Sequence, residues 1–249
     1  MERRDRAAVA TFFSPEPMEP GRTVALGEGE ARHARVLRLG VGERVRLVDG
    51  SGGLAWGPLV RLTKTQGAVD VEAVDRLEPL PVIHLVLPVA DRERMLLLAE
   101  KATEFGVASW RPVLWRRSRS VSPRGEGMTF QSKVRARMIG ALTQSGGGFL
   151  PVLYPDATPE RAVAACPQGE RWLLDADGEP PSALSGGDPL TIAVGPEGGV
   201  EDAERATFLE AGFRAVRLAP LTLRFETAAI AGLAVARAAV LTTLERSRV

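Results

Sequence analysis

Two short polar segments in the C-terminal part of the 249-residue chain carry the side chains best suited to chemistry. Gly195–Gly199 reads Gly-Pro-Glu-Gly-Gly and follows an apolar run that ends at Val194. Leu223–Ala229 reads Leu-Arg-Phe-Glu-Thr-Ala-Ala and follows a second apolar run. Each pattern is typical of a buried strand that ends in a loop and leads into a helix. Ligands of open α/β sheets bind outside such strand ends, so both segments are predicted to line a site.

The acidic residue at the centre of the first segment limits the ligands that this site can take. Phosphate cradles rely on backbone N–H groups and a lysine, and a carboxylate there would repel the phosphate. Glu197 therefore favours a neutral or cationic small molecule with hydroxyl or ammonium donors. S-adenosylmethionine, with its sulfonium and amino groups, meets this description. The chain has no G-x-G-x-x-G and no G-x-x-x-x-G-K-[ST], which disfavours nicotinamide-dependent and P-loop enzymes.

Few side chains offer metal or redox chemistry. Cys166 is the only cysteine, and His33 and His84 are the only histidines, so we expect no metal site and no disulfide framework. The first residues lack the apolar core of a secretory signal. The apolar stretch Ala228–Leu244 is rich in alanine and interrupted by Arg237, and we predict that it is too short and too weakly apolar to span a membrane. These features indicate a cytoplasmic protein without a membrane partner.

Charge is unevenly distributed along the chain. The whole sequence has 32 basic and 31 acidic side chains, but residues 111–137 carry eight basic side chains against one acidic. Such a surplus is typical of a surface that contacts an RNA backbone. It is equally typical of a solvated face in an arginine-rich chain, and charge alone leaves both interpretations open.

The apolar pattern changes near Pro79 and Pro81, which we interpret as a linker. Residues 1–10 are predicted to be a disordered tail. Residues 11–80 are predicted to be a small β-rich domain with one helix over Glu28–Leu39, ended by Gly40. Residues 81–249 alternate strands with helices, which favours a parallel sheet covered on both faces. We expect strands near residues 82–86, 109–114, 152–154, 172–175, 191–194 and 215–218, and helices near residues 92–105, 133–142, 202–211 and 227–246.

Together with further motifs, the two polar segments resemble the bacterial 16S ribosomal RNA uracil-N3 methyltransferases, a family of the trefoil-knotted SPOUT superfamily. The matching stretches are His33–Arg38, Asp49–Gly50, Lys101–Val107, Pro112, Ala141, Gln144, Ser145, Pro151, Gly195–Gly199 and Leu223–Ala228. The resemblance covers nearly all of the chain after the tail. It implies an α/β fold in which a C-terminal parallel-sheet α/β domain with a trefoil knot follows a small β-barrel PUA-like domain. It also implies a homodimer.

The same resemblance implies methylation of N3 of a uridine in 16S ribosomal RNA or the small ribosomal subunit, with S-adenosylmethionine as cofactor. Residues expected to contact the cofactor are Asp175, Val194, Gly195, Pro196, Glu197, Gly198, Gly199, Leu218, Ala219 and Leu223. At Gly198, a Cβ atom is expected to fill space that the cofactor needs. Residues expected to contact RNA are Arg35 and Arg38, on one helix face, and Lys101, Arg116, Arg117, Arg119 and Gln144.

Arg224 and Glu226 are the predicted catalytic residues. The lone pair of uracil N3 becomes available only as its proton leaves, and negative charge then spreads onto the flanking carbonyl oxygens. Arg224 would stabilise that charge. Glu226 would orient Arg224 or accept the proton, and we favour orientation because a carboxylate beside an arginine is weakly basic. A structural ion pair at a loop corner is the alternative interpretation of both residues.

The chain departs from the family pattern at positions that bear on RNA contact. Thr143 stands where the family has glutamate, and Gly147, Phe149 and Leu221 stand where it has arginines. The missing arginines keep open the alternative of an RNA-binding paralogue without catalysis. A ribose 2′-O methyltransferase of the same superfamily is the nearest alternative enzyme.

Overall fold

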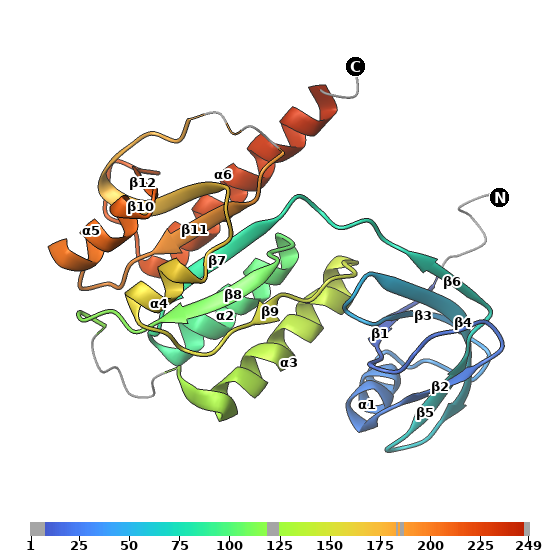
Figure 1. The fold of residues 1–249 in the computed structure, drawn as a ribbon. Helices are drawn as coiled ribbons and strands as arrows, with labels where there is room; N and C mark the ends of the chain where they lie inside the picture. The colour runs from blue at the N-terminus through green and yellow to red at the C-terminus, as the bar shows by residue number, and fades with distance from the viewer. Residues whose placement is uncertain (1–7, 119–124, 183, 185–186, 247–249) are drawn as a thin grey trace. The chain divides into compact units, whose positions relative to one another are not determined.

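The chain divides into two compact units in the computed structural model, which describes residues 8–118, 125–182, 184 and 187–246 (Figure 1). The first unit comprises Met1–Pro79 and Ile139–Leu150, and the second comprises Leu80–Met138 and Pro151–Val249. The sequence did not indicate that residues 139–150 belong with the N-terminal unit. Their side chains and backbone explain it: Leu142 is buried with Trp56, and the N–H of Gly52 bonds to the carbonyl of Gly148 at 2.8 Å.

The first unit is a curled sheet of six strands with one helix. Its elements are β1 (Thr11–Phe13), β2 (Thr23–Leu26), α1 (Glu28–Val36), β3 (Arg44–Val48), β4 (Gly53–Leu62), β5 (Gly67–Asp70) and β6 (Ala73–Arg76). The strand order is β1-β3-β4-β5-β2, with β6 also paired to β4. β4 pairs with β3 and β6 along its first half and with β5 along its second half, so one long strand links both halves of the sheet. Alternating residues such as Val45, Leu47 and Leu59 are fully buried in the core.

Helix α1 ends earlier than the sequence pattern predicts. Arg38 adopts a left-handed conformation (φ 59°), and the N–H of Leu39 bonds to the carbonyl of Ala34 at 2.9 Å. Together with the hydrogen bond from the N–H of Arg38 to the carbonyl of Arg35 at 2.9 Å, this bond forms a Schellman-type C-cap, in which half-buried Leu39 packs against the core. The prediction that Gly40 ends the helix is therefore wrong, because burial of Leu39 sets the end. Arg38 lies beyond the helix and does not share its face with Arg35.

The second unit alternates strands and helices around a second six-stranded sheet. Its elements are β7 (Ile83–Pro88), α2 (Arg92–Glu104), β8 (Ser109–Val113), α3 (Gly127–Ser145, whose last residues belong to the first unit), β9 (Val152–Leu153), α4 (Pro159–Ala164), β10 (Glu170–Glu179), β11 (Leu190–Val194), α5 (Asp202–Glu210), β12 (Arg214–Val216) and α6 (Phe225–Arg246). The order is β12-β10-β11-β7-β8-β9, and every pair is parallel. This confirms the predicted parallel-sheet α/β domain. The six-residue helix α4 was not predicted.

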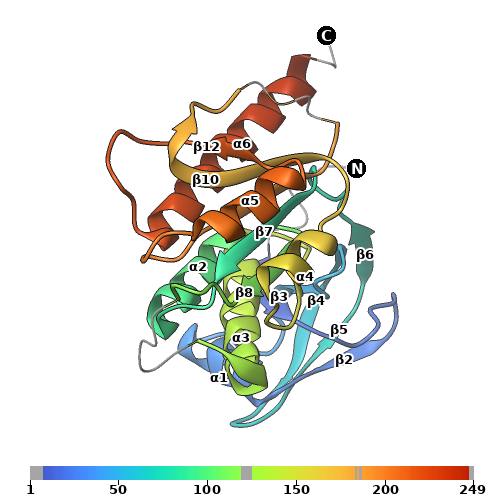
Figure 2. The ribbon, with the colours of Figure 1, turned by 60° about the vertical axis from the view of Figure 1, so that its left-hand side comes forward.

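Helices cover both faces of this sheet (Figure 2). On one face, α4 and α5 contribute Ala162 and Phe208 to a buried cluster with Val86, Leu173 and Ala193 of the strands. α6 packs against α2 and contacts β7, β10 and β11. Because both faces are covered, the carboxyl ends of the strands and their loops are the parts of the sheet left to form a site.

Helix α6 combines an apolar sequence with a buried arginine. Phe225–Thr243, with mean hydropathy 1.5, is long and apolar enough by length and composition to cross a membrane, so the prediction that it is too short and too weakly apolar is wrong. Of that window, 44% is buried within the structure. Arg237 is buried as well and donates hydrogen bonds to the carbonyls of Pro81, Phe105 and Gly106 at 2.8–3.0 Å. α6 is therefore packed along one side against α2 and the sheet.

Candidate active site

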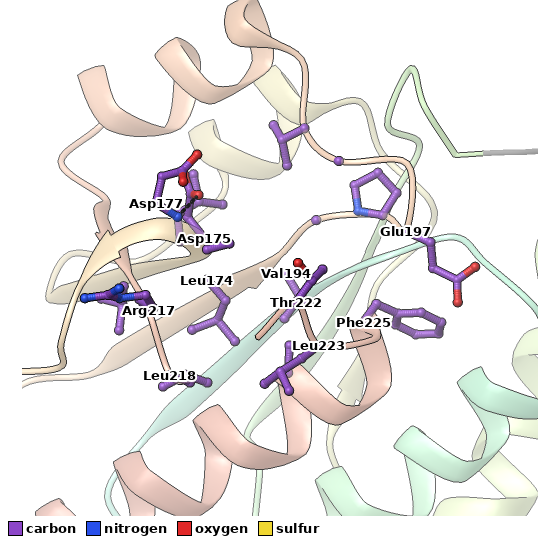
Figure 3. Close-up of a pocket in the computed structure, with 18 of the residues that line it drawn as sticks. Leu174, Asp175, Asp177, Val194, Glu197, Arg217, Leu218, Thr222, Leu223 and Phe225 are labelled. Carbon is purple, nitrogen blue, oxygen red and sulfur yellow. Dashed lines mark hydrogen bonds between the residues drawn. The ribbon is translucent and has the colours of Figure 1, made fainter. Parts of the chain in front are cut away.

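A cavity of about 340 Å³ lies at the carboxyl ends of β10, β11 and β12 (Figure 3). Its walls come from these strand ends, from the loops that follow them, and from the first turns of α5 and α6. The size and the position are typical of a small-molecule site in an α/β sheet. The structure thus brings both polar segments of the sequence to one cavity.

Nine of the ten residues expected to contact the cofactor line this cavity. They are Asp175, Val194, Gly195, Pro196, Glu197, Gly199, Leu218, Ala219 and Leu223. The sequence did not single out several other lining residues, among them Asp177, Asp202, Arg205, Arg217 and Phe225.

Gly198 has a different role from the one expected. A Cβ atom on Gly198 would lie 2.9 Å from the carbonyl oxygen and 3.1 Å from Cβ of Arg117. The lack of a side chain lets the glycine loop, Gly195–Gly199, approach the segment that follows β8. The expectation that a side chain at this position would fill cofactor space is therefore wrong. Gly199, with φ +79°, is the position in the loop whose backbone favours glycine.

Acidic side chains outnumber basic ones in the cavity wall. The acids are Asp175, Asp177, Glu197 and Asp202, and the bases are Arg205 and Arg217. Asp175 accepts hydrogen bonds from Arg205 Nε at 2.7 Å and from the N–H of Asp177 at 2.9 Å. The bond to Asp175 raises the pKa of the Arg205 guanidinium and ties α5 to the end of β10. Asp177, beside it, is exposed. The wall therefore carries net negative charge, which favours a cationic ligand.

The two predicted catalytic residues lie at the start of α6 and do not pair with each other. Glu226 is buried, with its side chain 11% exposed, and its Oε1 lies 3.7 Å from Nε of Arg94. Arg224 is exposed just before α6, and its side chain makes no ion pair with the residues that the structure describes. The expected orientation of Arg224 by Glu226 is thus not observed, because Arg94 is the cation beside Glu226.

Arg94 connects the two polar segments. It lies in the first turn of α2, where its N–H donates to the N-cap residue Asp91 at 3.1 Å. Its guanidinium contacts Glu197 of the glycine loop through Nη1 and faces Glu226 through Nε. In Figure 3, the side chains of Glu197 and Phe225 point to the same side, away from the interior of the cavity. Arg94 and Glu226 therefore lie next to residues that line the cavity.

Sequence reasoning missed Arg94, although a signal was present. Arg92 and Arg94 follow β7, a third buried parallel strand whose carboxyl end lies at the same edge as those of β10 and β11. Charged residues in the first turn after such a strand are candidates for the site.

Two of the predicted RNA-contact residues lie next to the glycine loop. Nη1 of Arg116 and Nε of Arg117 lie 3.9 and 3.6 Å from the carboxylate of Glu201, the N-cap residue of α5. Their side chains are 75% and 55% exposed, so both remain accessible to RNA. Arg111, from the same basic run, is instead buried, with its guanidinium 3.6 Å from the ring centre of Tyr154.

The remaining predicted RNA contacts are dispersed. Arg35, Arg38 and Gln144 are exposed in the first unit, where Arg35 also donates to the carbonyl of Lys64 at 3.4 Å. Arg119 lies outside the residues that the structure describes.

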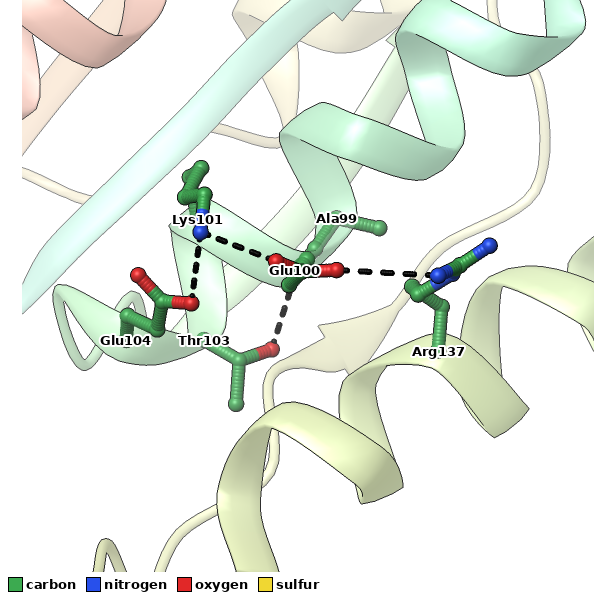
Figure 4. A network of polar contacts seen from close by, with 6 residues as sticks. All are labelled: Ala99, Glu100, Lys101, Thr103, Glu104 and Arg137. Atoms are coloured by element: carbon green, nitrogen blue, oxygen red, sulfur yellow. Dashed lines mark hydrogen bonds and ion pairs between the residues drawn. The ribbon is translucent and has the colours of Figure 1, made fainter. Parts of the chain in front are cut away.

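Lys101 is held in a network of charges on α2 and α3 (Figure 4). Its Nζ donates to Glu100 and Glu104 at 2.8 Å, and Glu100 also lies 3.6 Å from Arg137. The hydrogen bonds to Glu100 and Glu104 raise the pKa of Lys101. A phosphate would have to compete with two carboxylates for this ammonium group. We therefore expect Lys101 to contribute less to RNA binding than Arg116 and Arg117.

The chain resembles known proteins along nearly its whole length. The RNA methyltransferase domain family matches residues 77–237, and the RNA methyltransferase PUA domain matches residues 26–66. Ribosomal RNA small subunit methyltransferase E of Aquifex aeolicus is 29% identical over 227 residues, which cover 88% of this chain and 95% of the relative. The Mycobacterium bovis protein of the same name is 29% identical, with 90% of each chain covered.

Solved structures agree with these matches. The crystal structure of a ribosomal RNA small subunit methyltransferase E from Neisseria gonorrhoeae, bound to S-adenosyl methionine, matches with a TM-score of 0.82 and 27% identity. The match covers 92% of this chain and 97% of that chain. The PUA-like N-terminal domain predicted from the sequence is thereby confirmed, as is the resemblance on which it depended. Because the RNA methyltransferase domain family matches residues 77–237, which are more than half of the chain, this chain belongs to the RNA methyltransferase family.

Proposed function

We propose that this protein transfers a methyl group from S-adenosylmethionine to N3 of a uridine in 16S ribosomal RNA. One observation supports the proposal above all: the short segment from Leu223 to Ala228 lines the cavity and also holds charged side chains beside it. Leu223, Phe225 and Ala228 line the cavity. Arg224 and Glu226 lie between these residues in the sequence but are not part of the lining. The relatives are named as methyltransferases of small-subunit ribosomal RNA, and these names support 16S ribosomal RNA as the substrate.

The cavity fits the cofactor in size and in charge. Leu218 and Leu223 offer apolar surface for the adenine, and the exposed carboxylate of Asp177 offers an acceptor for hydroxyl or ammonium donors. Gly195 lies in the wall, where a Cβ atom would meet Cγ2 of Val200 at 2.4 Å, so the loop has no room for a side chain there. When bound, S-adenosylmethionine supplies an electrophilic methyl group on its sulfonium.

The residues beside the cavity take up the N3 proton and stabilise the negative charge that develops on the uracil. Glu226 accepts the N3 proton as the N3–H bond breaks, and the electron pair left on N3 forms the bond to the methyl carbon while the sulfur keeps the pair of the broken bond. Arg224 stabilises the negative charge that spreads over the uracil carbonyl oxygens, a role for which its lack of an ion pair among the described residues suits it. Although an arginine lies beside Glu226, Arg94 also contacts Glu197, so the group of three carries a net charge of −1, which a proton taken up from N3 would neutralise.

Further properties of the family form part of the proposal. The second unit would contain the trefoil knot, and the enzyme would act as a cytoplasmic homodimer in ribosome biogenesis, on RNA or on the small subunit. Exposed Ala234, Val235 and Ala238 on α6 support a dimer, because small side chains permit close approach of a second helix.

The test is product analysis. Purified protein, 16S ribosomal RNA or small subunits, and isotope-labelled S-adenosylmethionine are incubated, and digested nucleosides are separated by mass spectrometry. We expect labelled 3-methyluridine. A labelled 2′-O-methylnucleoside would instead indicate the ribose methyltransferase, and RNA binding without any product would indicate the inactive paralogue.

A further inference from the structure

We infer that Glu226, held by Arg94, selects uracil and excludes cytosine at the reacting position. The inference rests on the proposed function. It assigns the selection of the nucleobase to Arg94 and Glu226.

Glu226, which follows the cavity-lining residue Phe225, has one carboxylate oxygen without a hydrogen-bond donor among the described residues. Oε1 of Glu226 faces Arg94, whereas Oε2 is buried and accepts no hydrogen bond from the residues that the structure describes. Buried carboxylate oxygens ordinarily have donors, so an unpaired one beside a ligand cavity points to a donor on the ligand. Rotation about the terminal torsion of the side chain is soft, so either oxygen can be presented to that donor.

Arg94 faces the other oxygen of this carboxylate. It is the cation that lies next to Glu226 among the described residues, and it is shared with Glu197, so one guanidinium faces two carboxylates. Arg224 is two positions earlier and exposed. The backbone N–H of Arg94 donates to the side chain of Asp91, which places Arg94 in the first turn of α2. The guanidinium of Arg94 contacts Glu197 as well as facing Glu226.

The two pyrimidines differ at the atom that is methylated. Uracil presents an N3–H donor between two carbonyl oxygens, whereas cytosine presents an N3 lone pair beside an amino group. A carboxylate accepts a hydrogen bond from uracil N3–H but opposes the lone pair of cytosine N3. Cytosine N3 needs no deprotonation to react, so the enzyme has to exclude cytosine by binding. Sites built to pair with a substrate N–H reject analogues without it by about 10⁴-fold or more.

The experiment compares two RNAs that differ only by uridine or cytidine at the target position. kcat/KM is measured for the wild type and for Glu226→Gln, whose amide can donate to cytosine N3. We expect the wild type to prefer uridine by about 10⁴-fold. In Glu226→Gln this ratio should fall at least 100-fold, with 3-methylcytidine appearing by mass spectrometry and with the cofactor Kd within threefold of the wild type.

Arg94 is tested in parallel as a positioning residue. Arg94→Ala should lower the uridine-to-cytidine ratio about 10-fold, and Arg94→Lys should restore part of it, because a lysine replaces the charge but not the planar fork. In the Glu226→Gln background, Arg94→Ala should change the ratio no further, as expected for residues that act through one another. Arg214→Ala is the matched control, since Arg214 pairs with Glu170 at the same 3.7 Å at the amino end of the sheet and should leave the ratio unchanged.

An unchanged ratio in Glu226→Gln would overturn the inference, as would a loss of cofactor affinity greater than 10-fold, which would assign Glu226 to the cofactor. If Glu226→Gln fails to fold, Arg94→Ala decides, because the side chain of Arg94 is 32% exposed, compared with 11% for that of Glu226. A wild type that produces no 3-methyluridine would overturn the proposed function itself, so the two failures are distinct.

Discussion

Nε of Arg94 and Oε1 of Glu226 lie 3.7 Å apart and join the first turn of α2 to the first turn of α6. The same guanidinium contacts Glu197 in the glycine loop. The glycine loop, which lines the cavity, and the helix that carries Glu226, the proposed acceptor of the N3 proton, are thus linked through a third element. Displacement of any one of these three side chains is expected to affect the other two.

Arg224→Ala should lower kcat by about 10²–10³, by analogy with the loss of an oxyanion-hole donor. Cofactor affinity should change little, because Arg224 does not line the cavity. Arg224→Lys should recover part of the rate, and higher pH should partly restore the alanine variant as more N3 ionises unaided. Single-turnover kinetics and calorimetry measure these quantities. A normal turnover, or a defect confined to cofactor binding, would place Arg224 outside catalysis.

Two glycines of the glycine loop should respond differently to a side chain. Gly195→Ala should weaken cofactor binding, because its Cβ would lie 2.4 Å from Val200 in the cavity wall. Gly198→Val should instead lower stability, because its Cβ would lie 2.9 Å from the carbonyl of Arg117. Calorimetry and urea denaturation separate the two effects. Gly140→Ala, where a Cβ would meet nothing within 4 Å, is the control and should be neutral or stabilising.

Arg237 should contribute strongly to stability. Arg237→Met keeps much of the apolar stem but leaves the carbonyls of Pro81, Phe105 and Gly106 without their donor. The expected loss in the free energy of unfolding is about 2–4 kcal/mol, measured by urea denaturation. Arg161→Met, an exposed substitution in α4, is the control. A loss below about 0.5 kcal/mol, as for an ordinary surface position, would contradict this role.

His84 should make the fold sensitive to acid. Burial, and then the charge of Arg111, lower the pKa of His84 from its usual 6.5. The unfolded chain therefore binds the proton more readily than the folded chain. The contribution of neutral His84 is present above about pH 6.5 and is lost as pH falls through the lower folded pKa. Urea denaturation at pH 7.5 and 5.5 should show a larger drop in the wild type than in His84→Gln, and equal drops would count against this account.

RNA binding should depend steeply on salt through Arg116 and Arg117. Replacing both with alanine should weaken binding and reduce the slope of log K against log salt by about one unit per lost phosphate contact. Fluorescence anisotropy over a salt series measures the slope. Arg161→Ala serves as the control for a change in net charge. An unchanged slope would mean that these two side chains form only a solvated surface.

Local sequence patterns predicted most of the residues that line the cavity, because its walls are strand ends and the loops that directly follow them. An apolar run such as Leu190–Val194, buried along its whole length, can hardly be other than a strand, and the glycine loop after it has to lie at the strand's end. The parallel order of the strands then brings Leu223 and Leu218 to the same edge.

Contacts between distant segments could not be predicted in this way. Arg94 is one of several charged residues at the start of α2, and only the fold places its guanidinium between Glu197 and Glu226. The requirement for glycine at position 198 comes from the backbone of Arg117, which no local pattern reveals. The end of α1 likewise depends on the burial of Leu39 in the core of the first unit.

The activity proposed for this protein is methylation of uracil N3 in 16S ribosomal RNA. Its most direct test is mass spectrometry of 16S ribosomal RNA from cells with the gene deleted, from the same cells complemented with the wild-type gene, and from cells complemented with Arg224→Ala. We expect one 3-methyluridine to be absent from the deletion strain, to return with the wild-type gene, and to stay absent or strongly reduced with Arg224→Ala. An unchanged content of 3-methyluridine in the deletion strain would contradict this proposal.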